Sequence, residues 1–504
     1  MKPARHGVRL VSHMLKPLSS DRWNYETAAH LLNRAGFGGP PSEIETLADL
    51  NHDAAISALL DYENIPDGTP NPDWAKPDPE RMSRLRDIYQ HGTPEEKKAA
   101  QQAENKQQNL WMQELRGWWL QRMARGPRPL QEKMVLFWHG HFATSTDKVR
   151  EAYYMWRQNE LFRLLATRNW QQLLADAGKD PAMLIWLDQA QSNKQHPNEN
   201  FAREVMELFA LGEGHYTEHD IGEGARALTG WSLDRIEQKY VYRPGLHDNS
   251  DKTFLGRTGN LDGDDVIAQI VAQPQAARFI TAKLWNYFTG QYPTDGLNTA
   301  LATVFRANGN NFKPFLRVMF RSEEFYSDDI IRNQVKGPVQ WLIGSVRMLE
   351  CDLPPTLVSY GMLRQLGQDL FAPPNVKGWD GGVTWITTNT LLARYNQAAM
   401  LVMGQGNLGA QGDGRPGQQM AAQFANAAAR RMAPAEMDAI VAQDDRRDAE
   451  TLMAALGKRF MQGRLTDKHR QILRDYLGSR TDFDDMDVRH AIRLLMSTPE
   501  YQVT

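Results

Sequence analysis

The chain has 504 residues, of which 41% are hydrophobic and 24% charged, the composition of a globular protein. Because 58 Lys and Arg face 61 Asp and Glu, the net charge of −3 gives no argument for binding nucleic acid or an anionic membrane. Cys351 is the only cysteine, which excludes a disulfide framework and any multi-cysteine zinc or iron–sulfur site.

The N-terminal stretch Met1–Tyr25 is basic but lacks the apolar run of about 7–15 residues that marks a signal peptide. No apolar run of about 18 residues follows, so no transmembrane segment is expected. These observations predict a cytoplasmic protein, although a chain trimmed of its signal would look the same.

Helical periodicity dominates and predicts a mainly α fold. Residues 1–62 are predicted as an N-terminal helical segment. Residues 63–93, rich in Pro and Asp, are predicted as a linker or long loop. A large main helical domain follows over 94–403, beginning with a long helix from Pro94 to about Arg125.

The second half of the chain contains three further features. Residues 231–259 alternate like β-strands between turn residues, which predicts a small β-hairpin or loop excursion. Gly/Gln-rich residues 404–440 are predicted as a linker. Residues 441–504 are predicted as a C-terminal helical unit, and their similarity to 280–326 ("RLLMSTPEYQ" against "RVMFRSEEFY") indicates a duplication.

The stretch "HPNENFAREVMELFALGEG" predicts a helix from Glu199 to Leu211, capped by Asn198 and ended by Gly212. Five polar side chains fall within one arc of about 140°: Glu199, Asn200, Arg203, Glu204 and Glu207. Two interpretations stay open. The arc is either a solvated face with an Arg203–Glu207 pair, or a partly buried carboxylate cluster that needs cations or a metal as partners.

His139 and His141, in "FWHGHFATS", form a His-X-His pair of the kind found in metal sites. On an α-helix the two rings point about 160° apart, whereas a helix ended at Gly140 would bring them to one side. They are either core or capping histidines or, with helical carboxylates, ligands for zinc, iron or manganese. The predicted metal ligands are His139, His141, Glu199 and Glu207.

Two loops carry further candidates. His247, Asp248 and Lys252 lie in the turn-rich "LHDNSDKTFLG", as functional groups or as parts of Asx turns. "FAPPNVKGWDGGVTWI" offers Lys377 and, in Trp379, a stacking platform, unless this loop is purely structural. No P-loop, dinucleotide-binding glycine motif, G-x-S-x-G or H-E-x-x-H motif occurs, so no nucleotide or organic cofactor is expected.

Several blocks resemble the bacterial DUF1800 family of proteins of unknown function. They include "AAHLLNRAGFG", "FWHGHFATS", "PNENFAREVMELFALG", "ARALTGW", "HDNSDKTFLG", "ARFITAKLWNYF" and "PPNVKGWDGGVTWI". The resemblance implies a helical fold in which the polar clusters form one site, with Arg34 and Arg226 as added cationic partners. It also implies a phosphatase- or sulfatase-like neighbour as a partner and a periplasmic location for exported members. The family more often has Asn at the position of Gly140.

Three functions follow as hypotheses. The first is a metal-dependent enzyme of hydrolase type. Its catalytic residues would be Arg203, Glu204, Glu207, His247, Asp248 and Lys252, with Asn200, Lys377 and Trp379 contacting the ligand. The second is a non-catalytic scaffold in which Arg34, Arg203 and Arg226 form a buried network with the carboxylates. The third is a carbohydrate- or peptide-binding module.

Overall fold

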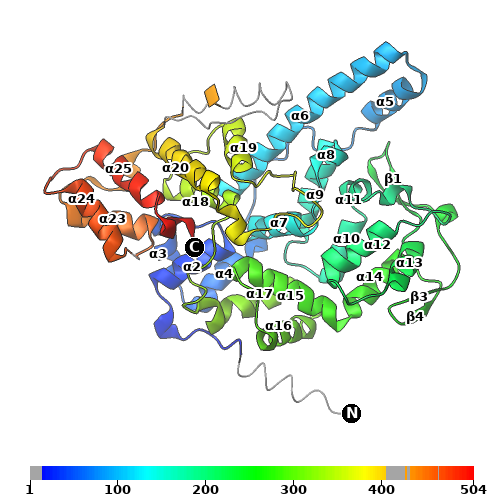
Figure 1. The fold of residues 1–504 in the computed structure, drawn as a ribbon, viewed down its shortest axis with the longest axis horizontal. Helices are drawn as coiled ribbons and strands as arrows, with labels where there is room; N and C mark the ends of the chain where they lie inside the picture. Colours follow the sequence, from blue (N-terminus) through cyan, green and yellow to red (C-terminus); the bar gives the residue numbers. More distant parts are fainter. Residues whose placement is uncertain (1–13, 405–425, 428–431, 464) are drawn as a thin grey trace.

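The computed structural model describes residues 14–404, 426–427, 432–463 and 465–504 (Figure 1). Helices dominate these residues, which confirms the mainly α prediction. The N-terminal segment forms α2 (Tyr25–Ala35), α3 (Pro41–Ala48) and α4 (His52–Leu60). Asn24 accepts hydrogen bonds from the first backbone N–H groups of α2, and Pro41 occupies the first turn of α3, as these residue types favour.

Helices α5 (Pro79–His91) and α6 (Pro94–Arg125) form a hairpin that protrudes from the body (Figure 1). The linker predicted over 63–93 is therefore wrong for its second half, where Asp78 caps α5 and a proline opens it. Helix α6 buries side chains only from Gln108 onward, so the hairpin is anchored at its base and exposed at its tip.

The central part of the chain is a succession of short helices. They are α7 (Pro129–His141), α8 (Thr146–Val149), α9 (Ala152–Leu164), α10 (Trp170–Gly178), α11 (Pro181–Trp186), α12 (Glu199–Glu204) and α13 (Glu218–Ala227). A π-helical turn, Val205–Ala210, directly follows α12. Four 3₁₀ turns lie between the helices and strands of residues 20–246: Ser20–Arg22, Tyr62–Asn64, Gln189–Gln191 and Pro244–Leu246.

The predicted β excursion is confirmed and consists of two antiparallel hairpins. The first pairs β1 (Trp231–Asp234) with β2 (Lys239–Tyr242), with Trp231 opposite Tyr242. The second pairs β3 (Lys252–Phe254) with β4 (Arg257–Gly259), and Thr253 lies opposite Thr258. Neither hairpin extends the other, so the described strands form two separate two-stranded sheets.

The two predicted repeats show the same order of elements. After α14 (Gly263–Ala272), the first contains α15 (Pro274–Thr289), α16 (Asp295–Ala307), α17 (Phe312–Arg321) and a 3₁₀ turn, Glu323–Tyr326. The C-terminal unit contains α23 (Ala449–Phe460), α24 (Asp467–Leu477), α25 (Asp485–Met496) and a 3₁₀ turn, Pro499–Gln502. This correspondence agrees with a duplicated helical unit.

Between the repeats lie α18 (Pro338–Met348), α19 (Thr356–Gln365), α20 (Thr388–Met403) and α22 (Met437–Ile440), with 3₁₀ turns at Gly382–Trp385 and Gln443–Arg446. Most of the linker predicted over 404–440 lies outside the described residues. One hydrophobic cluster extends from Leu15 to Tyr501, so the N-terminal helices and the C-terminal unit share a core with the main domain.

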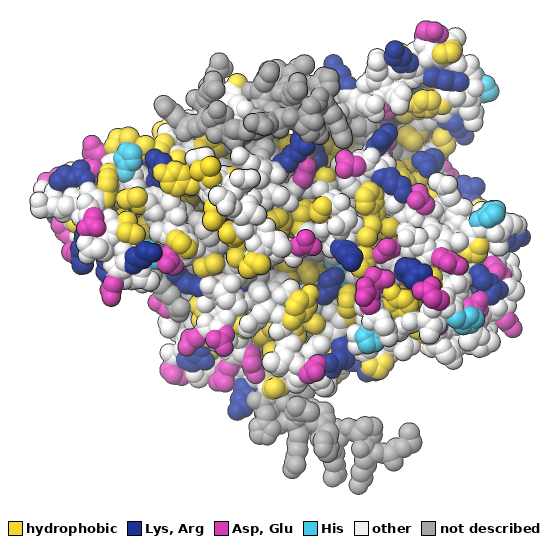
Figure 2. Space-filling view, viewed as in Figure 1, with side chains coloured by type: hydrophobic (Ala, Val, Ile, Leu, Met, Phe, Trp, Pro, Cys, Tyr) yellow, Lys and Arg dark blue, Asp and Glu magenta, His cyan; other side chains and the backbone are white. Residues whose placement is uncertain are grey.

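On the face of the molecule shown in Figure 2, basic and acidic side chains are interspersed. None of the helices in the described part of the chain is long and apolar enough to cross a membrane.

Candidate functional site

The polar helix predicted from Glu199 to Leu211 changes its winding midway. It runs as α12 and then as the π-helical turn, in which the Leu211 N–H bonds to the Met206 carbonyl five residues back. The predicted ends are confirmed, because Asn198 caps the helix and Gly212 has a φ of +81°. The π turn gives Glu207 a position that regular α spacing does not predict. Such turns occur frequently at functional sites.

Side chains from two other helices donate hydrogen bonds to the last carbonyls of this turn. His141 Nε2 lies 2.9 Å from the Phe209 oxygen, and Gln275 Nε2 lies 3.0 Å from the Leu211 oxygen. Lys283 Nζ approaches the Leu208 oxygen at 3.5 Å. Helix C-termini leave carbonyls unpaired, which explains why hydrogen-bond donors from a histidine, a glutamine and a lysine gather here.

His141 is a buried neutral imidazole with one unused nitrogen. Since a carbonyl only accepts, the bond to Phe209 places the proton on Nε2 and leaves Nδ1 as a bare acceptor. That Nδ1 is buried and has no hydrogen-bond partner in the described structure. Burial holds the pKa of His141 well below its usual value, so the ring stays neutral at physiological pH.

Lys283, on α15, is partly buried beside an aromatic ring. Its Nζ lies 5.1 Å from the centre of the Phe279 ring, and no ion pair to it is found within the described residues. Burial lowers the pKa of Lys283 to about 8, because the charged form loses hydration and gains no carboxylate.

Both groups line a pocket of about 750 Å³. Its walls come from the π turn, from α15 and from the loop that carries Lys377. The lining residues are His141, Glu207, Leu208, Gly212, Glu213, His215, Gln275, Arg278, Phe279, Ala282, Lys283, Tyr292, Asn298, Val376 and Lys377. The volume is that of a small-molecule site, and the wall combines apolar surface with converging charges, as such sites do.

Of the carboxylates of the polar helix, Glu207 lines this pocket. Glu207 accepts a hydrogen bond of 2.9 Å from the Tyr216 hydroxyl. Burial and the neighbouring Glu207 raise the pKa of Glu204, while the Lys377 ammonium opposes this rise. The structure thus brings three predicted residues, His141, Glu207 and Lys377, into one pocket wall, and the charges of Glu207 and Lys377 act on Glu204.

The loop that carries Lys377 is seated on the end of α7. Gly378 has a φ of +84°, and a Cβ there would lie only 2.1 Å from the Gly140 oxygen. Trp379 covers Gly140 from the same loop, since a Cβ on Gly140 would meet its ring at 3.7 Å. Trp379 therefore packs against the protein, and its indole nitrogen is buried without a partner in the described structure.

The predicted metal ligands do not form one site. Helix α7 continues through His141, so His139 and His141 point to different sides. His139 lies 3.0 Å from the Asn159 amide nitrogen among aromatic rings, and burial lowers its pKa to about 3. Glu199, like Asn200, is exposed. Among the described residues, no three His, Cys, Asp or Glu side chains are grouped so as to hold a metal ion.

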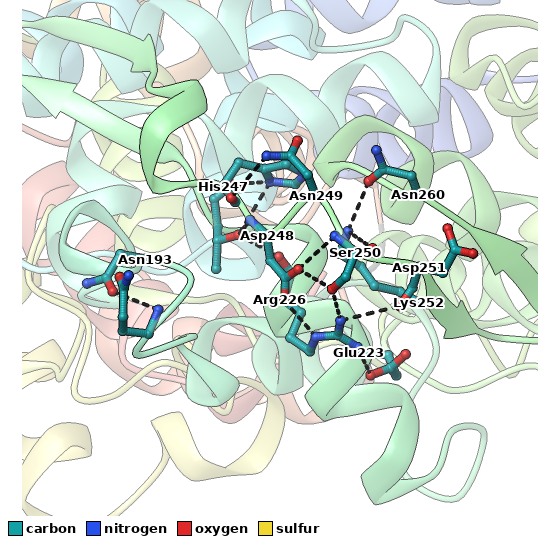
Figure 3. Close-up of polar contacts among 12 residues, drawn as sticks. Asn193, Glu223, Arg226, His247, Asp248, Asn249, Ser250, Asp251, Lys252 and Asn260 are labelled. Carbon is teal, nitrogen blue, oxygen red and sulfur yellow. Dashed lines mark hydrogen bonds and ion pairs between the residues drawn. The ribbon is translucent and has the colours of Figure 1, made fainter.

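The predicted residues His247, Asp248 and Lys252 form a separate structure, which we call the clasp together with Glu223, Arg226 and Ser250 (Figure 3). Arg226 donates to Asp248 at 2.8 Å and to Glu223 at 2.6 Å, and it also contacts Ser250. Lys252 Nζ donates to the Ser250 carbonyl at 3.0 Å. No clasp residue is among those that line the pocket, so the prediction of one joint site is wrong for this cluster.

Electrostatics in the clasp favour the ionised, paired state. Burial alone would raise the pKa of Asp248, but hydrogen bonds from Arg226 and Ser250 hold it below its usual range. His247 is also engaged, with Nδ1 at 2.8 Å from the Thr229 carbonyl. The clasp thus connects the β3–β4 hairpin and the loop before it to α13 through hydrogen bonds and ion pairs.

The buried network of arginines and helical carboxylates predicted for a scaffold is not formed either. Arg34 is fully buried but donates to the carbonyls of Phe288, Ile330 and Thr504, and burial lowers its pKa to about 9. Arg203 pairs with Glu218 at the surface. A buried network does exist elsewhere, where Glu132 forms ion pairs with Arg122 and Arg163.

Sequence reasoning missed Lys283, Arg278 and Tyr216 as site residues. Lys283 and Arg278 lie in the block "ARFITAKLWNYF". A lysine among the apolar residues of this predicted helix was the one feature that could have marked Lys283 as a site residue. Their place in the pocket wall that also contains Glu207 depends on helix packing, which spacing along the chain does not encode.

A family model covers nearly the whole chain, matching residues 30–503. The chain belongs to the DUF1800 family. The description of that family is "protein of unknown function", so membership supports the fold but assigns no activity to the DUF1800 protein. No match is found among curated proteins or among solved structures.

Proposed function

We propose that the DUF1800 protein is an enzyme of hydrolase type that binds an anionic small molecule, carboxylate or phosphate, in the pocket beside the π turn. The observation that carries this proposal is Lys283: a partly buried amine in a pocket wall, without a carboxylate partner in the described structure. An anionic ligand would supply the missing charge and raise the lysine pKa again.

The other lining groups fit the same chemistry. Lys377 adds positive charge to the wall that Lys283 occupies, and so does Arg278, which is also paired with Asp295 at 3.2 Å. Glu207, oriented by Tyr216, is the group placed to move a proton, and the bare Nδ1 of His141 accepts a hydrogen bond. Hydrolysis is the reaction class to screen first, because the sequence contains no organic-cofactor motif.

The test combines binding and turnover. Calorimetry with inorganic phosphate and with malonate should show binding that Lys283→Met weakens at least roughly tenfold, the loss of one charged hydrogen bond. Lys313→Met is the matched control. Lys313 lies on α17, away from the pocket lining, and is paired with Asp61 and Glu63. Glu207→Gln should then retain anion binding but lose hydrolysis of chromogenic phosphate and carboxylate esters. Equal anion affinity in Lys283→Met and wild type would refute the proposal.

Metal dependence is a separate question from this pocket. Elemental mass spectrometry of protein purified without chelator would decide it. One equivalent of zinc, iron or manganese would require a ligand set other than His139, His141, Glu199 and Glu207, because no three of these side chains are grouped in the described structure.

A scaffold role for a phosphatase-like partner is the second candidate, and the protruding α5–α6 hairpin favours it. The tip of this hairpin exposes Tyr89, and Leu110 is exposed further along α6. Co-purification with and without residues 80–105 of the hairpin would distinguish a scaffold from an enzyme that needs only the pocket.

A further inference from the structure

A second pocket, of about 430 Å³, lies at the base of the α5–α6 hairpin. Two indoles line it: Trp74, from the segment before α5, and Trp111, from α6. Their rings are stacked, with centres 5.5 Å apart and planes 21° from parallel. Trp74 is fixed in place because its Nε1 donates to Glu114 at 2.8 Å. The pocket therefore has a rigid aromatic wall.

Polar groups of both signs complete this pocket. Arg81 lies 5.4 Å from the centre of the Trp111 ring and bridges Glu151 at 2.7 Å and Glu104 at 2.8 Å. Only one oxygen of Glu151 is used by Arg81 and Gln108. Burial raises the pKa of Glu151, although Arg81 opposes the rise. The wall thus offers donors and acceptors side by side, next to apolar rings.

The charges argue against a charged ligand. A cation would meet Arg81, which already occupies the space beside Trp111. An anion would meet three carboxylates, Glu151, Asp78 and Glu80, which outnumber the lining cations Arg81 and Lys76. A neutral molecule with many hydroxyl groups and one apolar face avoids both conflicts, and that description fits a saccharide.

We infer that the base of the α5–α6 hairpin is a saccharide-binding site, in which Trp74 stacks on a sugar ring and Glu151 accepts hydrogen bonds from its hydroxyls. The volume of about 430 Å³ suits one or two sugar units. This site shares no lining residue with the pocket beside the π turn, so the inference does not rest on the proposed function.

The test uses the full chain with cellobiose, maltose and N,N′-diacetylchitobiose, followed by saturation-transfer NMR and tryptophan fluorescence. At least one disaccharide should bind, and Trp74→Ala should weaken it roughly tenfold, the loss of one stacking contact. Trp23→Ala is the control, because that indole stacks on His52 at 4.6 Å, outside the pocket. Glu151→Gln provides a second variant should Trp74→Ala fail to fold, and it should weaken binding as well.

Three results would overturn the inference: no disaccharide binds, binding is unchanged in the folded Trp74→Ala or Glu151→Gln protein, or Trp23→Ala weakens binding equally. Tetramethylammonium serves as the probe for the competing ligand class. If it binds and no disaccharide does, the pocket is a cation site and the saccharide assignment is wrong.

Discussion

The clasp and the pocket beside the π turn contain the same kinds of residues and differ in how these are satisfied. In the clasp, Arg226 pairs with two carboxylates, and Lys252 donates to a backbone carbonyl at 3.0 Å, so each cation has a close hydrogen-bond partner. In the pocket, Lys283 has no carboxylate and His141 has a free Nδ1 in the described structure. Unsatisfied polar groups cost stability, and where they line a pocket they are candidates for contact with a ligand.

The comparison shows why loop polarity alone was misleading. "HDNSDKT" has the composition of an active-site loop, yet its Ser250 side chain donates to Asp248, and Asp248 accepts from Arg226 of α13. The lysine in "ARFITAKLWNYF" has none of these features in sequence, but the fold places it in a pocket wall. Whether a charged side chain has a partner in the fold is therefore better evidence for a binding site than the number of charged residues in a loop.

The largest expected effect concerns the contact of the Lys377 loop, which forms part of the pocket wall, with the end of α7. Gly378→Ala combines a strained positive φ with a clash against backbone, and should cost about 2–4 kcal/mol of unfolding free energy. Gly140→Ala should be nearly neutral, because its Cβ meets only Trp379 at an ordinary contact distance. Urea denaturation of both variants measures this difference. Equal costs would mean that the loop is not seated on α7 as described.

The next effect tests the clasp itself. Arg226→Ala leaves Asp248 and Glu223 without their common partner and should destabilise the protein by about 1–2 kcal/mol. Anion binding in the pocket should be unchanged. If Arg226→Ala abolished anion binding while the protein remained folded, the clasp and the pocket would be one site after all.

A smaller effect concerns the pH dependence of stability. Burial lowers the pKa of Lys283 from 10.5 to about 8 in the folded protein. The unfolded chain then binds more protons between these two values, so the free energy of unfolding rises with pH across that window. Partial exposure reduces this contribution to about 1 kcal/mol.

Lys283→Met should remove that rise, measured as the difference from wild type in urea denaturation at pH 7.5 and at higher pH, about 10. The difference is needed because burial also lowers the pKa values of Lys133 and Lys336, each to about 7. In Lys313, ion pairs with Glu63 and Asp61 raise the pKa although burial opposes them, so Lys313→Met should leave the slope unchanged. A slope unaltered in Lys283→Met would show that this amine is well hydrated.

The smallest effect is expected for Arg203→Ala. Arg203 and Glu218 form a two-pronged pair at 2.8 and 2.9 Å, but the pair is exposed to solvent. Exposed pairs contribute little, so thermal unfolding should not change measurably. A large loss of stability would revive the buried network that the scaffold hypothesis assigned to this arginine.

The sequence by itself determined the features that depend on neighbours along the chain. The long helix from Pro94 to Arg125, the Asn198 cap, the Gly212 end and the β excursion were all predictable, because caps, turns and periodicity act locally. The similar order of elements in the two repeats was visible for the same reason. The predicted linker was wrong over α5, where Asp and Pro cap a helix instead of breaking it.

Only the tertiary structure decided which polar residues meet. The sequence left open whether the helix ends at Gly140; in the fold α7 continues through His141, so His139 and His141 face different surroundings. Lys283 reaches the Leu208 carbonyl, 75 positions away, because α15 packs against the π turn. The partners of a charge are set by how helices pack, and this information is not carried by local spacing.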